Sequence, residues 1–189
     1  MTSGFGNLIS NSQLIRLCEE KKIEIRPFEK ERSQLAHYPL DPEVILVREG
    51  ERWVTAHNFR LQPEPFNLSP RQYVIVEIRQ RIVVAEGYVG LFVPASNLIE
   101  RGLGITAGKI AYPFGQLNEQ IRFGLKNHLD EPNVVKVEDL MAYVQFFDLS
   151  KSHAKPYNLS ARDQEIYQKR RAIAADDGPW AVAAPDAPI

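Results

Sequence analysis

The residues of this chain whose types and order could do chemistry are gathered in the stretch FVPASNLIERGLGI, residues 92–105. An apolar strand ends at Pro94, and a polar turn with Ser96 and Asn97 leads into one helical turn followed by glycine. A strand, a small polar turn, a helix start and a glycine form an arrangement that binds phosphate through backbone N–H groups. Glu100 opposes this chemistry, because a carboxylate about 4 Å from a phosphate charge costs about 4 kcal/mol at an effective dielectric constant of about 20. The stretch is therefore either a working phosphate site or the remnant of one.

Composition and charge restrict the classes of protein to which the chain can belong. The 189 residues can bury a core in one domain, and a hydrophobic content of 44% is ordinary for a globular protein. The formal net charge of -1 gives no general attraction to nucleic acid or to an anionic membrane. No apolar run reaches the ~18 residues of a membrane span and the N-terminus lacks a secretion signal, so we expect a cytoplasmic protein. The single cysteine, Cys18, excludes an internal disulfide, and its apolar helical surroundings favour a buried, unreactive thiol.

The elements that must position the turn are mostly β-strands. Ser10 is typical of a helix N-cap and predicts a helix over residues 11–23. Prolines recur between short apolar runs in residues 23–70, and residues 72–93 are rich in β-branched and aromatic residues with a turn at Glu86-Gly87. Further strands are expected in residues 108–115, 120–128 and 133–149. One helix before many short strands predicts a β-barrel or a jelly-roll-like sandwich.

Beyond Leu149 the sequence becomes polar, with one helical candidate over residues 160–171. Residues 172–189 are rich in alanine and proline and are expected to be disordered on their own. We therefore expect one domain, residues 1–171, followed by a tail, residues 172–189.

The order and spacing of these pieces resemble those of the dCTP deaminase and dUTPase superfamily, and the deaminase branch more closely. The resemblance runs from about Leu8 to Arg171, and it includes LISNSQLIRLCEEKKIEIRPF as the N-terminal helix and strand and KPYNLSARDQEIYQKRR as the C-terminal lid. It implies a mainly β fold, a distorted dUTPase-like β-barrel with a short N-terminal helix and a C-terminal lid or tail. It also implies a homotrimer that binds a pyrimidine deoxynucleotide such as dCTP or dUTP between subunits, with Mg²⁺ carried by the triphosphate rather than by the protein.

The same resemblance implies a set of nucleotide-binding residues. Ser96 matches the first serine of the phosphate turn, and Asn97 keeps a polar group beside it. Tyr167 and Gln168 match the aromatic and amide pair of the lid, which contacts the nucleotide. Arg101 could replace a lost phosphate-binding cation, although one residue along a helix is about 100° of rotation and would point its side chain elsewhere.

The catalytic residues of the superfamily do not match. The deaminases have arginines where this chain has Ala95 and Glu100, and the superfamily's aspartate and glutamate positions fall on Ala111 and Gly124. Losing a positioned base costs about 10²- to 10⁴-fold in rate, so we expect catalysis to be lost or strongly altered. Two alternatives stay open: an active dCTP deaminase or deoxynucleotide hydrolase with Glu100 or Glu119 as a displaced base, and a non-catalytic assembly or regulatory scaffold. The four scattered histidines predict no metal site.

Overall fold

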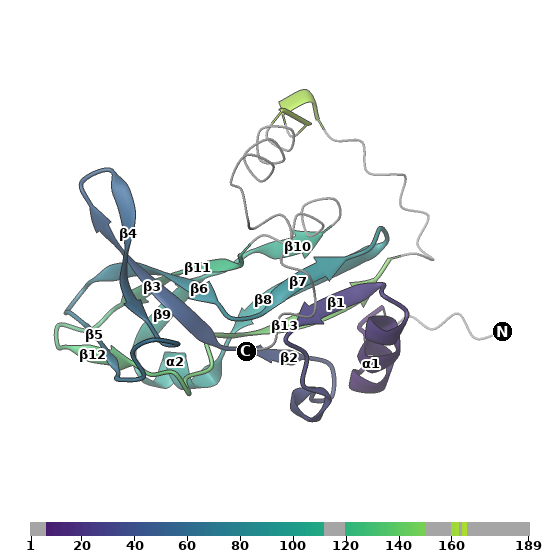
Figure 1. The fold of residues 1–189 in the computed structure, drawn as a ribbon, viewed down its shortest axis with the longest axis horizontal. Helices are drawn as coiled ribbons and strands as arrows, with labels where there is room; N and C mark the ends of the chain where they lie inside the picture. Colours follow the sequence, from purple (N-terminus) through teal and green to yellow (C-terminus); the bar gives the residue numbers. More distant parts are fainter. Residues whose placement is uncertain (1–6, 112–119, 150–159, 163, 166–189) are drawn as a thin grey trace. The chain divides into compact units, whose positions relative to one another are not determined.

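The computed structural model describes residues 7–111, 120–149, 160–162, 164 and 165 (Figure 1). Its contacts divide the chain into two compact units, Met1–Lys151 and Ser152–Ile189. Within the described residues, the strands and the helices Asn11–Glu19 and Ser96–Glu100 belong to the first unit. In the second unit, the backbone N–H of Gln164 donates to the carbonyl of Ser160 at 2.9 Å, which is the helical spacing expected for this segment. The boundary predicted between residues 171 and 172 lies outside the described residues.

Two sheets form most of the first unit. The five-stranded sheet has the order β4 (Arg52–Asn58), β3 (Pro42–Glu49), β6 (Tyr73–Ile78), β11 (Arg122–Asn127) and β9 (Leu103–Thr106). The four-stranded sheet has the order β10 (Lys109–Ala111), β8 (Tyr88–Pro94), β13 (Ala142–Asp148) and β2 (Tyr38–Leu40). Two small antiparallel sheets pair β1 (Ile23–Arg26) with β7 (Arg81–Val84) and β12 (Asn133–Val135) with β5 (Phe66–Leu68). The helical elements are α1 (Asn11–Glu19), the 3₁₀ turn η1 (Lys30–Arg32) and α2 (Ser96–Glu100).

The N-terminal helix α1 begins where the sequence predicts it, but it ends at Glu19 rather than at residue 23, which is the first residue of β1. Ser10 caps it, and the side chains of Ser10 and Gln13 bond reciprocally to each other's backbone N–H groups. Leu14 and Leu17 lie on one face of the helix and are buried in the core. The predicted helix start is confirmed, and the apolar face of the helix packs on the core.

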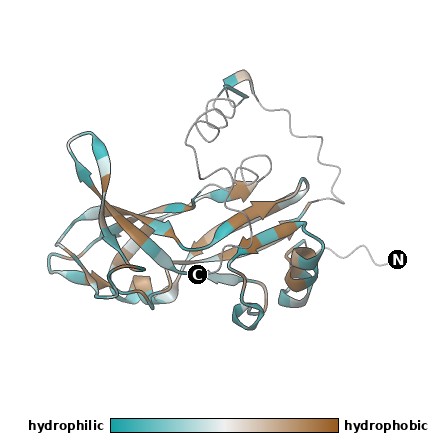
Figure 2. Cartoon of the chain, viewed as in Figure 1, coloured by the Kyte–Doolittle hydropathy of each residue, from teal (hydrophilic) through white to brown (hydrophobic). Residues whose placement is uncertain are grey.

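The core lies between the inner faces of the sheets. Along β6 the side chains of Val74, Val76 and Ile78 alternate with outward residues and are fully buried. Phe123 and Leu125 of β11 face the same core. Figure 2 shows apolar residues running along β1, β7 and β8, as expected for strands that cover a common core. This alternation fixes which side chains of each strand face outward.

The fold class predicted from the sequence is confirmed, because the chain is mainly β with a short N-terminal helix. In the described part of the chain the strands form separate sheets rather than a closed barrel. The segment expected to be β from residue 133 to 149 is two strands in different sheets, β12 and β13. The break is a turn in which Asp139 accepts the backbone N–H of Lys136 at 2.9 Å and its own N–H donates back to the Lys136 carbonyl. No helix among the described residues is long and apolar enough to span a membrane.

Candidate functional site

The turn singled out by the sequence joins strand β8 to helix α2. Ala95 and Leu98 are fully buried and attach the turn to the core, while β8 ends at Pro94. Gly102 follows α2 with φ +65°, and a Cβ there would lie 2.7 Å from Leu129 Cγ, so this position requires glycine. The strand, polar turn, short helix and glycine predicted from residues 92–105 are therefore present.

Three polar residues of α2 could contact a ligand. Ser96 and Glu100 are exposed and Asn97 is half-buried. No side chain caps the start of α2, and the Leu98 N–H donates to the Ala95 carbonyl at 3.1 Å. Among the described residues, the N–H groups of Ser96 and Asn97 have no such bond and can meet a ligand. The exposed Glu100 brings a negative charge to the same short helix. The turn can offer a hydroxyl, an amide and backbone N–H groups, but α2 carries no cation that faces them.

Arg101 is held by the protein itself. Its guanidinium donates to Asp139 Oδ2 at 2.8 Å, to Asn133 Oδ1 at 3.3 Å and to the carbonyl of Val134. The Asn133 amide donates back to the Arg101 carbonyl at 2.8 Å. The Arg101 and Asp139 side chains are 27% and 11% exposed, so this is a largely desolvated network. Arg101 ties α2 to β12 and to the connection that follows it.

Gly124, where the resemblance puts the general base, has no space for a side chain. An added Cβ would lie 1.9 Å from Tyr73 Oη and 2.3 Å from Thr106 Oγ1. Gly124 pairs with Ile75 on β6 and with Thr106 on β9, so the Tyr73 ring reaches over it diagonally from two residues along β6. Trp53 packs edge-on against Tyr73, with ring centroids 6.1 Å apart. A tyrosine hydroxyl therefore occupies the space that a carboxylate at this position would need.

Of the other predicted site residues, one is described by the structure and three are not. Ala111 is half-buried at the end of β10, paired with Val89, and supplies no carboxylate. Glu119, Tyr167 and Gln168 lie outside the described residues.

The described histidines do not gather around a common centre. His37 packs edge-on against Tyr143, and His57 packs against Phe59, each with ring centroids 4.5 Å apart. His128 lies over Gly104, where an added Cβ would be 2.5 Å from its Nε2. Within residues 7–111 and 120–149 no three His, Cys, Asp or Glu side chains are placed to hold a metal ion.

Cys18 is half-buried beside the core, and it is not a candidate nucleophile. Burial raises the pKa of its thiol to about 11, and the nearby Glu19 and Glu24 carboxylates add to this effect. The thiolate, which is the reactive form, is therefore scarce at neutral pH.

Comparison with solved structures decides the fold. The structure matches 2'-deoxycytidine 5'-triphosphate deaminase from Agrobacterium tumefaciens with a TM-score of 0.59 and 11% identity. The match covers 90% of this chain and 55% of the deaminase chain. The chain has the dCTP deaminase fold. The resemblance predicted from the sequence is confirmed at the level of the fold, and this chain spans about half of that deaminase.

Weaker matches to dUTPases accompany the deaminase fold. The dUTPase of EIAV matches at TM-score 0.41 and 14% identity, covering 65% of this chain and 95% of that one. A dUTPase from phage phi11 of S. aureus matches at TM-score 0.45 and 13% identity, covering 74% of this chain and 97% of that one. No protein-family profile matches the sequence, and no curated protein matches it significantly.

Two features of this deaminase-fold site were missed from the sequence. Tyr73 is separated from Gly124 by about 50 residues and is brought there by the pairing of β6 with β11. A strand glycine beside an aromatic residue is a known packing device, so a correct strand register could have revealed it. The partners of Arg101 come from β12 and its following turn, and the Asn133 and Asp139 positions carry no local signal that links them to α2.

Proposed function

We propose that this chain is a nucleotide-binding protein of the dCTP deaminase fold in which the standard deamination or diphosphate-release chemistry is lost. The observation that carries the proposal is the Tyr73 hydroxyl at Gly124, because it fills the space that the general base would need. Deamination needs a base that activates water, and neither Gly124 nor Ala111 supplies one. A strand, a polar turn and a short helix are present around Ser96, which supports binding more than catalysis.

The proposed ligand is a pyrimidine deoxynucleotide such as dCTP or dUTP. Ser96 and Asn97 would hydrogen-bond it from the start of α2, and Tyr167 and Gln168 would close over it from the tail. Any Mg²⁺ would arrive on the triphosphate, since the described residues do not form a cage of carboxylates for it. Phosphate affinity is expected to be weak, because Glu100 repels phosphate and Arg101 is engaged with Asp139.

We also propose that the protein assembles as a homotrimer. Leu91 and Val93 on the outer side of β8 are 40% and 37% exposed. Val93 pairs with Tyr143 of β13 and Leu91 with Gln145, so these residues share one sheet face. A row of exposed apolar side chains on a sheet supports burial against another subunit.

A binding titration tests the ligand. Full-length protein is titrated with dUTP and with dCTP in the presence of Mg²⁺, and heat release or a change in tryptophan fluorescence is followed. We expect saturable binding that Ser96→Ala weakens by about tenfold, the equivalent of one charge-assisted hydrogen bond. Ser69→Ala, at another exposed serine in a turn, is the matched control and leaves affinity unchanged. Absence of binding at millimolar nucleotide would contradict the proposal and favour the scaffold alternative.

A further inference from the structure

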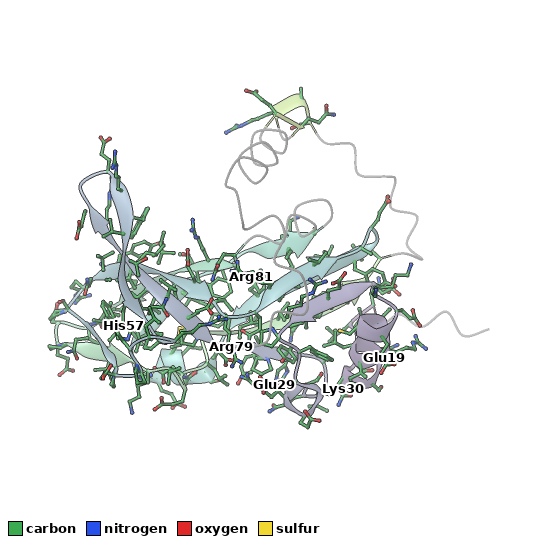
Figure 3. All side chains as sticks on the ribbon, viewed as in Figure 1. Glu19, Glu29, Lys30, His57, Arg79 and Arg81 are labelled. Atoms are coloured by element: carbon green, nitrogen blue, oxygen red, sulfur yellow. The ribbon has the colours of Figure 1, made fainter. Side chains whose placement is uncertain are left out.

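Two exposed aromatic side chains meet on the outer face of the five-stranded sheet. Trp53 of β4 and Tyr73 of β6 are 39% and 43% exposed, and their ring centroids are 6.1 Å apart at an interplanar angle of 62°. Tyr73 lies over Gly124, where no side chain comes between its ring and the strand. The hairpin of β3 and β4, which carries Trp53, projects beyond the other strands (Figure 3). Both rings are therefore large apolar groups that solvent can reach.

Each ring has a basic residue as its partner on the neighbouring strand. Arg48 of β3 is paired in register with Trp53, and Lys126 of β11 is paired with Tyr73. Residues directly opposite each other on antiparallel strands point to the same face of the sheet. Because the two rings are in contact, all four side chains share one face. We call Arg48, Trp53, Tyr73 and Lys126 the basic aromatic patch.

Neutral groups hold the two cations of the patch. Arg48 donates from Nε to the carbonyl of Gly50 at 2.9 Å, and Lys126 donates from Nζ to the carbonyl of Arg71. In the described part of the chain neither cation forms an ion pair, and the Asp130 carboxylate is bound by Arg71 at 2.6 and 2.8 Å. Both terminal nitrogens of the Arg48 guanidinium and part of the Lys126 ammonium therefore remain to bind a negative ligand.

The carboxylates of these strands do not oppose such a ligand. Glu77, on the same face of β6, accepts the Nε–H of Arg122 at 2.8 Å and is 13% exposed, so its charge is paired and shielded. Glu49 and Arg52 are paired one residue farther along the hairpin, and because side chains alternate along a strand they point to the other face. Glu51 lies in the turn of the hairpin, beyond the paired strands. The patch thus presents two positive charges and two rings on an open face.

A ligand that matches this patch combines planar rings with negative charges. Nucleotides do so, because bases stack on aromatic side chains and phosphates pair with arginine and lysine. A free nucleotide usually binds in a concave site that covers most of its surface. Here the rings stand on an open sheet face, and the combination of a ring and a cation occurs twice, side by side. A repeated contact of this kind suits a chain of repeated bases and phosphates.

We propose that the basic aromatic patch binds single-stranded nucleic acid, with bases stacked on Trp53 and Tyr73 and phosphates paired with Arg48 and Lys126. This binding is separate from the turn at Ser96 and does not depend on nucleotide binding there. The net charge of -1 confines the attraction to the patch, so we expect weak binding that is lost at high salt. Stacking accepts every base, so we expect little preference for sequence.

Quenching of Trp53 fluorescence measures the stacking directly. The chain has two tryptophans, so Trp180→Phe in the full-length protein leaves Trp53 as the single reporter. The titrant is oligothymidylate of about 16 nucleotides at low ionic strength, the upper end of site sizes for single-strand-binding β folds. We expect saturable quenching by the single strand and little by a duplex of equal length, whose bases are already stacked. Thymidine monophosphate should bind about tenfold more weakly or less, because it can stack on one ring only.

Substitutions separate the rings from the charges. Tyr73→Ala should weaken binding by about tenfold, the loss of one stacked base, whereas Tyr73→Phe keeps the ring and should bind as the wild type does. Two phosphate contacts predict a slope of about -1.4 for log affinity against log salt, and Arg48→Gln or Lys126→Gln should each reduce its size by about 0.7. Arg52→Gln is the matched control, because Arg52 is exposed on the same hairpin but points to the other face.

Four outcomes would overturn the proposal. The first is equal affinity and equal salt slope in the wild type, Arg48→Gln and Arg52→Gln, all of which change only exposed side chains and should fold. The second is thymidine monophosphate binding as tightly as the oligonucleotide, which would indicate a site for a free nucleotide. The third is polyglutamate binding as tightly as oligothymidylate, which would indicate an acidic protein segment. The fourth is loss of oligonucleotide binding in Ser96→Ala, which would place the strand at the proposed nucleotide site instead.

Discussion

Substitution of Gly124 is the most direct way to perturb the site, because the structure leaves almost no room for a side chain there. In Gly124→Ala the new Cβ would lie 1.9 Å from Tyr73 Oη, about 1.6 Å short of an ordinary contact of about 3.5 Å. Tyr73 is 43% exposed, so its ring can swing outward, but it then loses its packing on Trp53 and on the strand. Overpacking of this kind costs about 1–3 kcal/mol. At about 2–4 °C per kcal/mol, Gly124→Ala should lower the melting temperature by several degrees.

A double-mutant cycle isolates the tyrosine from other effects. In the Tyr73→Ala background the same Gly124→Ala substitution should cost at least about 1 kcal/mol less, although the contact with Thr106 Oγ1 at 2.3 Å remains. Gly108→Ala is the matched control, because no described residue lies within 4 Å of a Cβ at that glycine. Alanine at an open glycine stabilises by about 0.5–1 kcal/mol, so Gly108→Ala should be neutral or stabilising. Equal costs for Gly124→Ala in both backgrounds, measured by urea unfolding, would refute the view that Tyr73 fills this space.

Three other substitutions or measurements test separate parts of the account. Asp139→Asn weakens the contact that holds Arg101, and since both side chains are mostly buried we expect a loss of about 1–3 kcal/mol in unfolding free energy. Cys18, with a pKa of about 11, should react with a thiol reagent at about pH 8 on the order of 10²-fold more slowly than an ordinary cysteine, and faster as pH rises; a rate like that of free cysteine would contradict its burial. Light scattering should return a trimer, and Leu91→Asp with Val93→Asp should reduce its mass; a stable wild-type monomer at micromolar concentration would refute the trimer.

The fold could be predicted from the sequence where local rules apply. Ser10 marked the start of α1, and the strand, proline and glycine order from residue 92 to 105 marked the turn before α2. These features depend on capping and backbone geometry, which neighbouring residues determine. The order of pieces along the chain then indicated the deaminase fold, which the match at TM-score 0.59 confirms.

The environment of the candidate site was harder to predict from the sequence, because it depends on pairing between distant strands. Counting back from Asn127 located Gly124, and Asn127 is a buried anchor whose amide donates to the carbonyls of Ser69 and Glu131. Nothing local to Gly124 shows that Tyr73 covers it, since that follows from the register of β6 against β11.

The most direct test of the central claim is a turnover assay with dCTP and dUTP. Purified full-length protein is incubated with each nucleotide and Mg²⁺, and the products are separated by chromatography. Without a positioned base we predict no deamination of dCTP and no diphosphate release from dUTP above a background about 10²- to 10⁴-fold below a competent enzyme. Turnover that disappears in Glu100→Gln or in Glu119→Gln would contradict the account, because it would identify a displaced base and an active enzyme.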